Sequence, residues 1–161
     1  MIPKDEIIRL FKKEFDTTTR VLKALPAEKM DFKPHERSSD AKLLTSTFVF
    51  EMYLMRMYVF GDQMDRSVFK NYQPADMKTI INDFEKETRD VIARLEQLPE
   101  SDLNKIVDFG GGKFRADEYL LMILFDQIHH RGQLSVYIRM AGGKVPSIYG
   151  PSADDKGTNL N

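Results

Sequence analysis

The sequence contains no cysteine and no tryptophan among its 161 residues, and only three histidines. The absence of cysteine excludes disulfides, thiolate metal ligands and a cysteine nucleophile. No apolar run approaches the roughly 18 residues of a membrane-spanning helix, and the first residues carry acid where a secretory signal carries base. Lys and Arg (24) balance Asp and Glu (25), so no net charge attracts nucleic acid or an anionic membrane. We expect a soluble cytoplasmic protein that binds neither nucleic acid nor a membrane.

Length and composition are those of one folded unit. A chain of 161 residues that is 42% hydrophobic and 30% charged can bury a core and falls in the size range of a single domain. Residues 151–161 contain few apolar side chains, so they are expected to form a flexible tail. We therefore treat residues 1–161 as one domain with a short C-terminal extension.

Four segments show apolar residues at the alternating three- and four-residue spacing of an amphipathic helix. The first lies between Pro3 and Pro26, and the second follows Ser38-Ser39 and ends near Gly61. The third begins with the Pro and early acid of Gln73–Asp76 and stops before Pro99, and the fourth runs from about Arg115 to Ala141. In the first segment the predicted buried stripe is Ile8, Phe11, Phe15, Thr18, Leu22 and Leu25.

A glycine-rich turn separates the third and fourth helices. Ile106–Phe109 leads into Gly110–Gly112 and then Lys113-Phe114, which predicts a small β-hairpin or a tight reversal. Each apolar helix stripe must be buried against another helix. The fold class is therefore predicted to be all-α, a four-helix bundle of long up-down helices with a hairpin-like turn before the last one.

One acidic and one histidine side chain in the last helix could hold a metal ion. Asp126 and His130 are four residues apart, so they lie on one face of the helix, about 5–6 Å apart. His129 points about 100° away from this face. Ile123, Leu134 and Tyr137 share the face, so the pair is expected to look into the bundle. The spacing alone leaves two interpretations open: a divalent metal site, or a hydrogen bond between two buried polar groups.

The stretch from His129 to Arg139, with its His-His-Arg-Gly-Gln core, and the Gly142, Pro146 and Tyr149-Gly150 that follow resemble the signature of the DinB-like (DinB/YfiT) family. Phe32–Ser38 and Leu43–Ser46 resemble that family's entry to its second helix, so the likeness covers nearly the whole chain. The resemblance implies a four-helix bundle, frequently dimeric. It also implies a divalent metal, often zinc or nickel, held by three histidines and used in several relatives to activate a low-molecular-weight thiol.

Only part of the implied ligand set is present. The second-helix histidine of the family falls on Ser46, or on Thr47 if the register shifts by one, and the first fourth-helix histidine falls on Asp126. His130 alone keeps the ligand type. A serine hydroxyl is a poor ligand, whereas a carboxylate can replace imidazole. The resemblance thus implies a modified zinc or nickel site on Asp126 and His130, with a weak third position at Ser46. The alternative is that this site holds no metal.

Two further polar residues, Glu51 and Arg131, could lie near this site. Glu51 lies five residues after Ser46, about 140° around the helix, so we do not expect it on the same face. We interpret it as a buried hydrogen-bond partner of a cation such as Arg131, which is expected to anchor its helix. Glu51 and His129 remain neighbouring candidates for the metal.

The residues favour three hypotheses of function. The first is a metal-dependent protein with a modified site, related to thiol-dependent transferases or isomerases. The second is a metal-free ligand-binding or interaction module on the same scaffold, for which the serine at position 46 argues. The third is a nucleophile–base–orienter set of Ser46, His130 and Asp126, which lacks an evident oxyanion hole.

A second subunit is also expected. The run from Tyr119 to Phe125 is apolar on every side, whereas a bundle helix needs only one buried stripe. We therefore predict a two-fold homodimer that covers the extra apolar surface.

Overall fold

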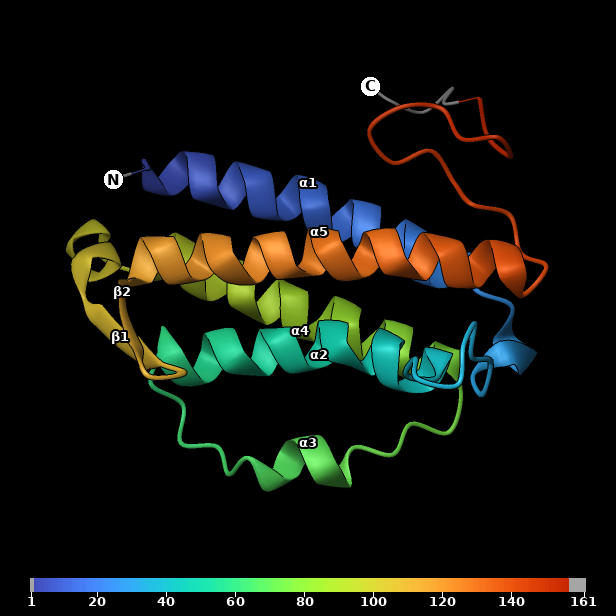
Figure 1. The fold of residues 1–161 in the computed structure, drawn as a ribbon. Coiled ribbons are helices and arrows are strands. Elements are labelled where there is room, and N and C mark those ends of the chain that lie inside the picture. The colour runs from blue at the N-terminus through green and yellow to red at the C-terminus, as the bar shows by residue number, and fades with distance from the viewer. Residues whose placement is uncertain (1, 157–161) are drawn as a thin grey trace.

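The computed structural model describes residues 2–156. Four long helices, one short helix, two 3₁₀ turns and one hairpin follow each other within these residues (Figure 1). In chain order they are α1 (Lys4–Lys23), η1 (Ala27–Lys29), α2 (Ala41–Tyr58), α3 (Ser67–Asn71), α4 (Met77–Gln97), η2 (Glu100–Asn104), β1 (Ile106–Phe109), β2 (Gly112–Arg115) and α5 (Ala116–Met140).

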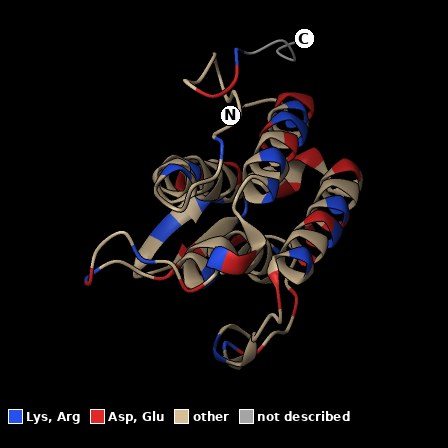
Figure 2. Cartoon of the chain, turned by 90° about the vertical axis from the view of Figure 1, so that its right-hand side faces the viewer, with Lys and Arg blue, Asp and Glu red and all other residues tan. Residues whose placement is uncertain are grey.

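The four long helices form a bundle in which α1 and α2 each pack against both α4 and α5. In Figure 1 the long helices run side by side, and α3 lies outside them on the loop between α2 and α4. Figure 2 shows basic and acidic residues interspersed on the outer faces of the helices. The predicted all-α class is confirmed. No helix within residues 2–156 combines the length and the apolar composition needed to cross a membrane.

The core is built around a chain of phenylalanine rings. Phe11 meets Phe15 edge to face, Phe15 meets Phe84, and Phe84 meets Phe48, with ring centroids 5.1–6.1 Å apart. These contacts join α1 to α4 and α4 to α2. The buried stripe of α1 begins at Ile7 rather than at the predicted Ile8, because the helix is rotated slightly relative to the assumed face.

Capping and turn residues set the ends of the helices. Asp40 precedes α2 and accepts a hydrogen bond from the Leu43 backbone N–H at 2.7 Å. Asp76 caps α4 in the same way. Gly142 follows α5 with a φ of +88°, the left-handed conformation that favours glycine at a helix exit. The predicted starts and stops of the long helices therefore agree with the structure to within a few residues.

The predicted hairpin is present and closes one end of the face formed by α2 and α5. β1 and β2 pair antiparallel, and Gly110 and Gly111 turn between them with φ values of +60° and +82°. The Phe109 ring packs 5.2 Å from Tyr58 on α2 and 5.2 Å from Tyr119 on α5. The hairpin thereby becomes one wall of the surface described below.

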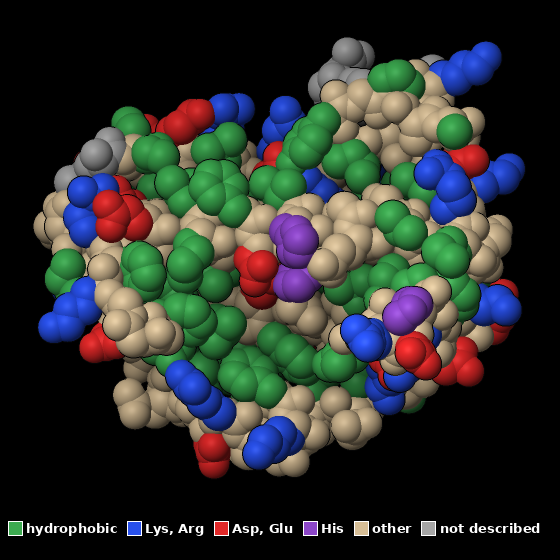
Figure 3. Space-filling model, in the orientation of Figure 1, with side chains coloured by type: hydrophobic (Ala, Val, Ile, Leu, Met, Phe, Trp, Pro, Cys, Tyr) green, Lys and Arg blue, Asp and Glu red, His purple; other side chains and the backbone are tan. Residues whose placement is uncertain are grey.

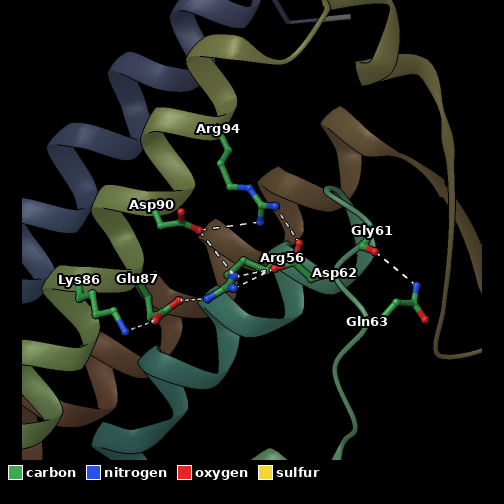
Figure 4. Close-up of polar contacts among 8 residues, drawn as sticks. All are labelled: Arg56, Gly61, Asp62, Gln63, Lys86, Glu87, Asp90 and Arg94. Atoms are coloured by element: carbon green, nitrogen blue, oxygen red, sulfur yellow. Dashed lines mark hydrogen bonds and ion pairs between the residues drawn. The ribbon is translucent and has the colours of Figure 1, made fainter.

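An ion-pair network joins the end of α2 and the loop after it to α4 (Figure 4). The Arg56 guanidinium contacts Glu87 at 2.6 Å and Asp62 at 2.9 Å, and Arg94 reaches Asp62 at 2.7 Å. The hydrogen bond from Arg94 is the largest effect on Asp62 and lowers its pKa; burial opposes it, and the hydrogen bond from Arg56 lowers the pKa further. This network satisfies Glu87, a nearly buried carboxylate of α4.

The segment after α5 folds back on the bundle. Asp154 accepts hydrogen bonds from Arg139 at 2.9 Å and from the Val145 backbone at 3.1 Å, and Asp155 accepts one from Ser147. These contacts hold the first part of the segment expected to be a flexible tail. Its last residues, 157–161, lie outside the described residues.

Candidate metal centre

Asp126 and His130 lie together on α5, one turn apart, facing α2. The Asp126 Oδ1 and His130 Nε2 atoms are 3.6 Å apart. The shared helix face predicted from their four-residue spacing is confirmed, and the donor atoms are closer than the predicted separation of about 5–6 Å, which is the spacing of Cβ atoms. We expected the pair to look into the bundle, but it is only partly buried. The Asp126 side chain is 53% exposed and that of His130 is 22% exposed. The two groups therefore sit at the mouth of the α2–α5 seam.

Glu51 completes this group from α2. Its Oε1 atom lies 3.9 Å from His130 Nε2, and one donor atom from each of Glu51, Asp126 and His130 can be chosen so that all lie within 4.8 Å of one another. As predicted, Glu51 does not share the face of Ser46, but it is Glu51 and not Ser46 that reaches the pair. Glu51 is one helical turn after Thr47 and so shares that residue's face.

The predicted pairing of Glu51 with Arg131 was also wrong. The Arg131 guanidinium, 1% exposed, contacts Glu14 of α1 at 2.6 Å and also bonds Thr18 and the Tyr149 hydroxyl. Arg131 therefore anchors α5 to α1 and to the C-terminal segment, as expected of it. Its partners lie on the side of α5 away from α2.

Glu51 is buried without a hydrogen-bond partner. Its side chain is 2% exposed, and neither carboxylate oxygen makes a hydrogen bond within residues 2–156. Burial raises the pKa of Glu51 well above its ordinary value, the Asp126 charge raises it further, and the nearby Gln127 amide lowers it slightly. Gln127 stands close but forms no hydrogen bond of ordinary geometry within the same residues. A buried carboxylate without a cation is costly, so the position of Glu51 is suited to binding a cation.

The imidazole of His130 is held in a defined orientation. Its Nδ1 lies 3.1 Å from Gln133 Oε1, and its ring packs edge to face on Phe48 with centroids 6.4 Å apart. An amide oxygen only accepts hydrogen bonds, so Nδ1 carries the proton in this arrangement. In the neutral ring Nε2 then carries the free lone pair, and it is the atom that faces Asp126 and Glu51. A histidine that binds a metal through one ring nitrogen usually donates the other ring N–H to such an acceptor, which orients the ring.

His129, the neighbouring candidate, lies outside this group. Its Nε2 lies 2.8 Å from the amide nitrogen of Gln133, which only donates. Gln133 thus bridges the two histidine rings, whose centroids are 5.4 Å apart. Figure 3 shows two histidines beside acidic atoms at the middle of this face, surrounded by hydrophobic side chains.

Ser46 and Thr47 line different cavities. Ser46 lies with Phe50 and Phe69 around a cavity beneath α3, and no hydrogen bond joins it to His130 within the described residues. Thr47 lines a cavity of about 430 Å³ together with His130 and Gln133. Of these two positions, Thr47 and not Ser46 shares a cavity with the histidine, which removes the geometric support for a Ser46 nucleophile or ligand.

The Glu51, Asp126 and His130 group fits a divalent metal ion. Two donors that each bind one ion at about 2.1 Å can be no more than about 4.2 Å apart. The separations from His130 Nε2 to Asp126 and to Glu51, 3.6 and 3.9 Å, meet this limit, and an Asp126 oxygen and a Glu51 oxygen lie within 4.8 Å of each other. Two carboxylates balance the charge of a divalent cation, and the unpaired oxygens of Glu51 gain a partner. We call this group the three-residue cluster.

Comparisons with known proteins place this geometry in a family context. A comparison with protein-family models matches residues 1–159 to the DinB family. The uncharacterized protein YjoA of Bacillus subtilis (strain 168) is 27% identical over 146 residues, which cover 88% of this chain and 93% of YjoA. The uncharacterized protein YrdA of the same organism is 36% identical over 59 residues, 37% of this chain and 35% of YrdA.

Solved structures share the fold. A DinB-like protein from Bacillus cereus ATCC 10987 matches with a TM-score of 0.80 at 22% identity, covering 90% of this chain and 97% of that protein. The structure of the DinB-like protein YjoA from Bacillus subtilis matches with a TM-score of 0.68 at 25% identity, covering 85% and 92%. Because the family match spans nearly the whole chain, this protein belongs to the DinB family.

Proposed function

We propose that this DinB family protein binds one divalent metal ion through Glu51, Asp126 and His130 and uses it to activate a small molecule. The observation that carries the proposal is the buried carboxylate of Glu51, which makes no hydrogen bond within residues 2–156 and lies 3.9 Å from Nε2 of an oriented histidine. A site that served only as a hydrogen-bonded pair of Asp126 and His130 would need no second, buried carboxylate.

The donor set narrows the choice of metal. One imidazole and two carboxylates suit zinc, manganese or iron(II), and no thiolate is available to select copper(I). We retain nickel as a candidate from the family resemblance. Carboxylate oxygens are harder Lewis bases than imidazole nitrogens. Manganese therefore competes with zinc better at this site than at a site made of imidazoles alone.

Three protein donors leave coordination positions for a small molecule, the arrangement of catalytic rather than structural zinc sites. An ion held there would lower the pKa of water or of a thiol, which is the chemistry expected of a hydrolase, thiol transferase or isomerase. The chain's own residues hold Glu51 in a dry environment and fix His130 through Gln133. The exposure of Asp126 leaves the same site open to ligands from solvent.

A metal-free binding module is the second candidate function. The observation that favours it is the hydroxyl residue on α2, Ser46 or, with a shift of one, Thr47, at the position where the family resemblance implies a histidine. Under this alternative, Asp126 and His130 are replaceable in ligand binding, and burial favours the neutral form of Glu51 by raising its pKa.

Metal uptake separates the two candidates. Untagged protein purified without metal affinity resin is dialysed against zinc, nickel and manganese in turn, and its metal content is measured by mass spectrometry. We expect about one equivalent per chain, lost in Glu51→Gln and His130→Ala and kept in His129→Ala, the matched histidine outside the cluster. Less than about a tenth of an equivalent for every metal would favour the metal-free module.

A further inference from the structure

Two cavities of different character adjoin the three-residue cluster. One, of about 430 Å³, lies beside His130 and combines apolar side chains such as Leu44 and Val136 with hydroxyl and amide groups from Thr47 and Gln133. The other, of about 460 Å³, lies beside Asp126. We call the second one the apolar groove. Its lining, apart from Asp126 and His129, is Leu54, Phe109, Met122, Ile123 and Phe125.

The apolar groove is built by three parts of the fold. Leu54 comes from α2, Phe109 from the hairpin, and Met122, Ile123 and Phe125 from α5. The Phe109 ring is held against Tyr58 and Tyr119, so this wall is fixed by packing behind it. Phe125 is 63% exposed, although a large apolar side chain normally gains free energy by burial. An exposed ring beside a polar cluster is typical of a ligand site.

The charges around the cluster restrict the ligand. No lysine or arginine lines either cavity in the described part of the chain, whereas Asp126 borders the apolar groove. The two carboxylates of the cluster cancel the charge of a divalent ion, which leaves no net positive charge to attract an anion. A carboxylate or phosphate on the ligand would therefore lie near Asp126 without a protein cation.

From these observations, and resting on the proposed metal site, we propose that the substrate is an uncharged small molecule with an apolar group about the size of a phenyl ring. The apolar group lies in the groove between Phe109 and Phe125. The polar end lies at the three-residue cluster and extends toward the cavity beside His130. Both cavities touch the cluster, so one molecule of modest length can reach all three regions.

A series of hydroxamates tests this inference, because one metal-binding head can carry different tails. Zinc-loaded protein is titrated calorimetrically with propionohydroxamate, 3-phenylpropionohydroxamate and the monohydroxamate of succinic acid. The phenyl compound is expected to bind roughly 10-fold tighter than the propionyl compound, from burial of the ring, and the succinyl compound weakest. Phe125→Ser should abolish the phenyl preference. Met140→Ser, which alters an equally exposed apolar residue of α5 outside the groove, should keep it.

The outcomes distinguish this inference from the metal proposal. Zinc uptake with equal affinity for the phenyl and propionyl compounds, or with preference for the succinyl compound, would overturn the substrate class alone. Failure to take up zinc would overturn both. Equal affinities together with a change of oligomeric state in Phe125→Ser would show that a second copy of the chain covers the groove. Zinc content and circular dichroism confirm that each variant is folded.

Discussion

Replacing Glu51 by glutamine should stabilise the metal-free protein and destabilise the metal-bound one. Glutamine keeps the size of the side chain but removes a carboxylate that is 2% exposed and unpaired within residues 2–156. In the metal-free state the parent must either bury the charge or keep a proton on it. Glu51→Gln avoids both costs.

The size of the effect depends on pH in a defined direction. Burial and the Asp126 charge raise the pKa of Glu51 in the folded state above its ordinary value of 4.5. The stability of the parent is therefore full below that value and is lost as the pH rises toward the folded-state pKa. While the folded carboxyl stays protonated, the advantage of Glu51→Gln grows by about 1.4 kcal/mol per pH unit. It stops growing above the folded-state pKa.

Zinc should reverse this order. At about 100 times its dissociation constant, a ligand of the folded state stabilises it by about 2.7 kcal/mol. Only the parent gains this increment, because the variant lacks a ligand. Urea unfolding is followed by circular dichroism from about pH 5 to about pH 8, once with chelator and once with zinc.

The matched control is Glu87→Gln. The Glu87 side chain is also nearly buried, at 5% exposure, but it contacts Arg56 at 2.6 Å. Its loss should therefore destabilise the protein by roughly 1.5–3 kcal/mol, equally in zinc and in chelator. The reasoning is refuted if Glu51→Gln behaves like Glu87→Gln, losing stability in chelator at neutral pH, or if zinc stabilises parent and Glu51→Gln alike.

Three further predictions follow from other contacts. Gln133→Leu removes the acceptor 3.1 Å from His130 Nδ1 and should weaken zinc binding about 10- to 100-fold in a competition titration, with little change in stability; unchanged affinity would contradict the orienting role. Arg131→Met leaves buried Glu14 without its cation and should cost about 3–5 kcal/mol in urea unfolding, and a loss below about 1 kcal/mol would contradict it. Phe125→Glu, in the exposed part of the apolar run that predicts a second subunit, should turn the predicted homodimer into monomer by light scattering, and a monomeric parent would contradict the dimer.

The bundle could be predicted because each long helix carries an apolar stripe and recognisable ends. Pro3, the Asp76 cap and Gly142 mark boundaries that the structure reproduces closely. The short α3 was not predicted. It has five residues in a polar loop, too few for a periodic stripe, and it is supported by tertiary packing, since Phe69 meets Phe50 of α2 at 5.2 Å.

The candidate site could be predicted only within one helix. The Asp126–His130 proximity follows from spacing along α5, whereas the position of Glu51 depends on how α2 is rotated against α5. Glu51 lies three residues after Phe48 and four before Met55, both fully buried, so it continues the core stripe of α2. An acid within a buried stripe was the available signal. The exposure of Asp126 depends on the seam between helices and has no local signature.

The most direct test is a crystal structure of zinc-soaked protein with anomalous data collected on both sides of the zinc absorption edge. The account predicts one anomalous peak between α2 and α5, about 2.0–2.2 Å from a Glu51 oxygen, an Asp126 oxygen and His130 Nε2. A peak bound by His129 without Glu51, or a cluster without a peak under saturating zinc, would contradict it.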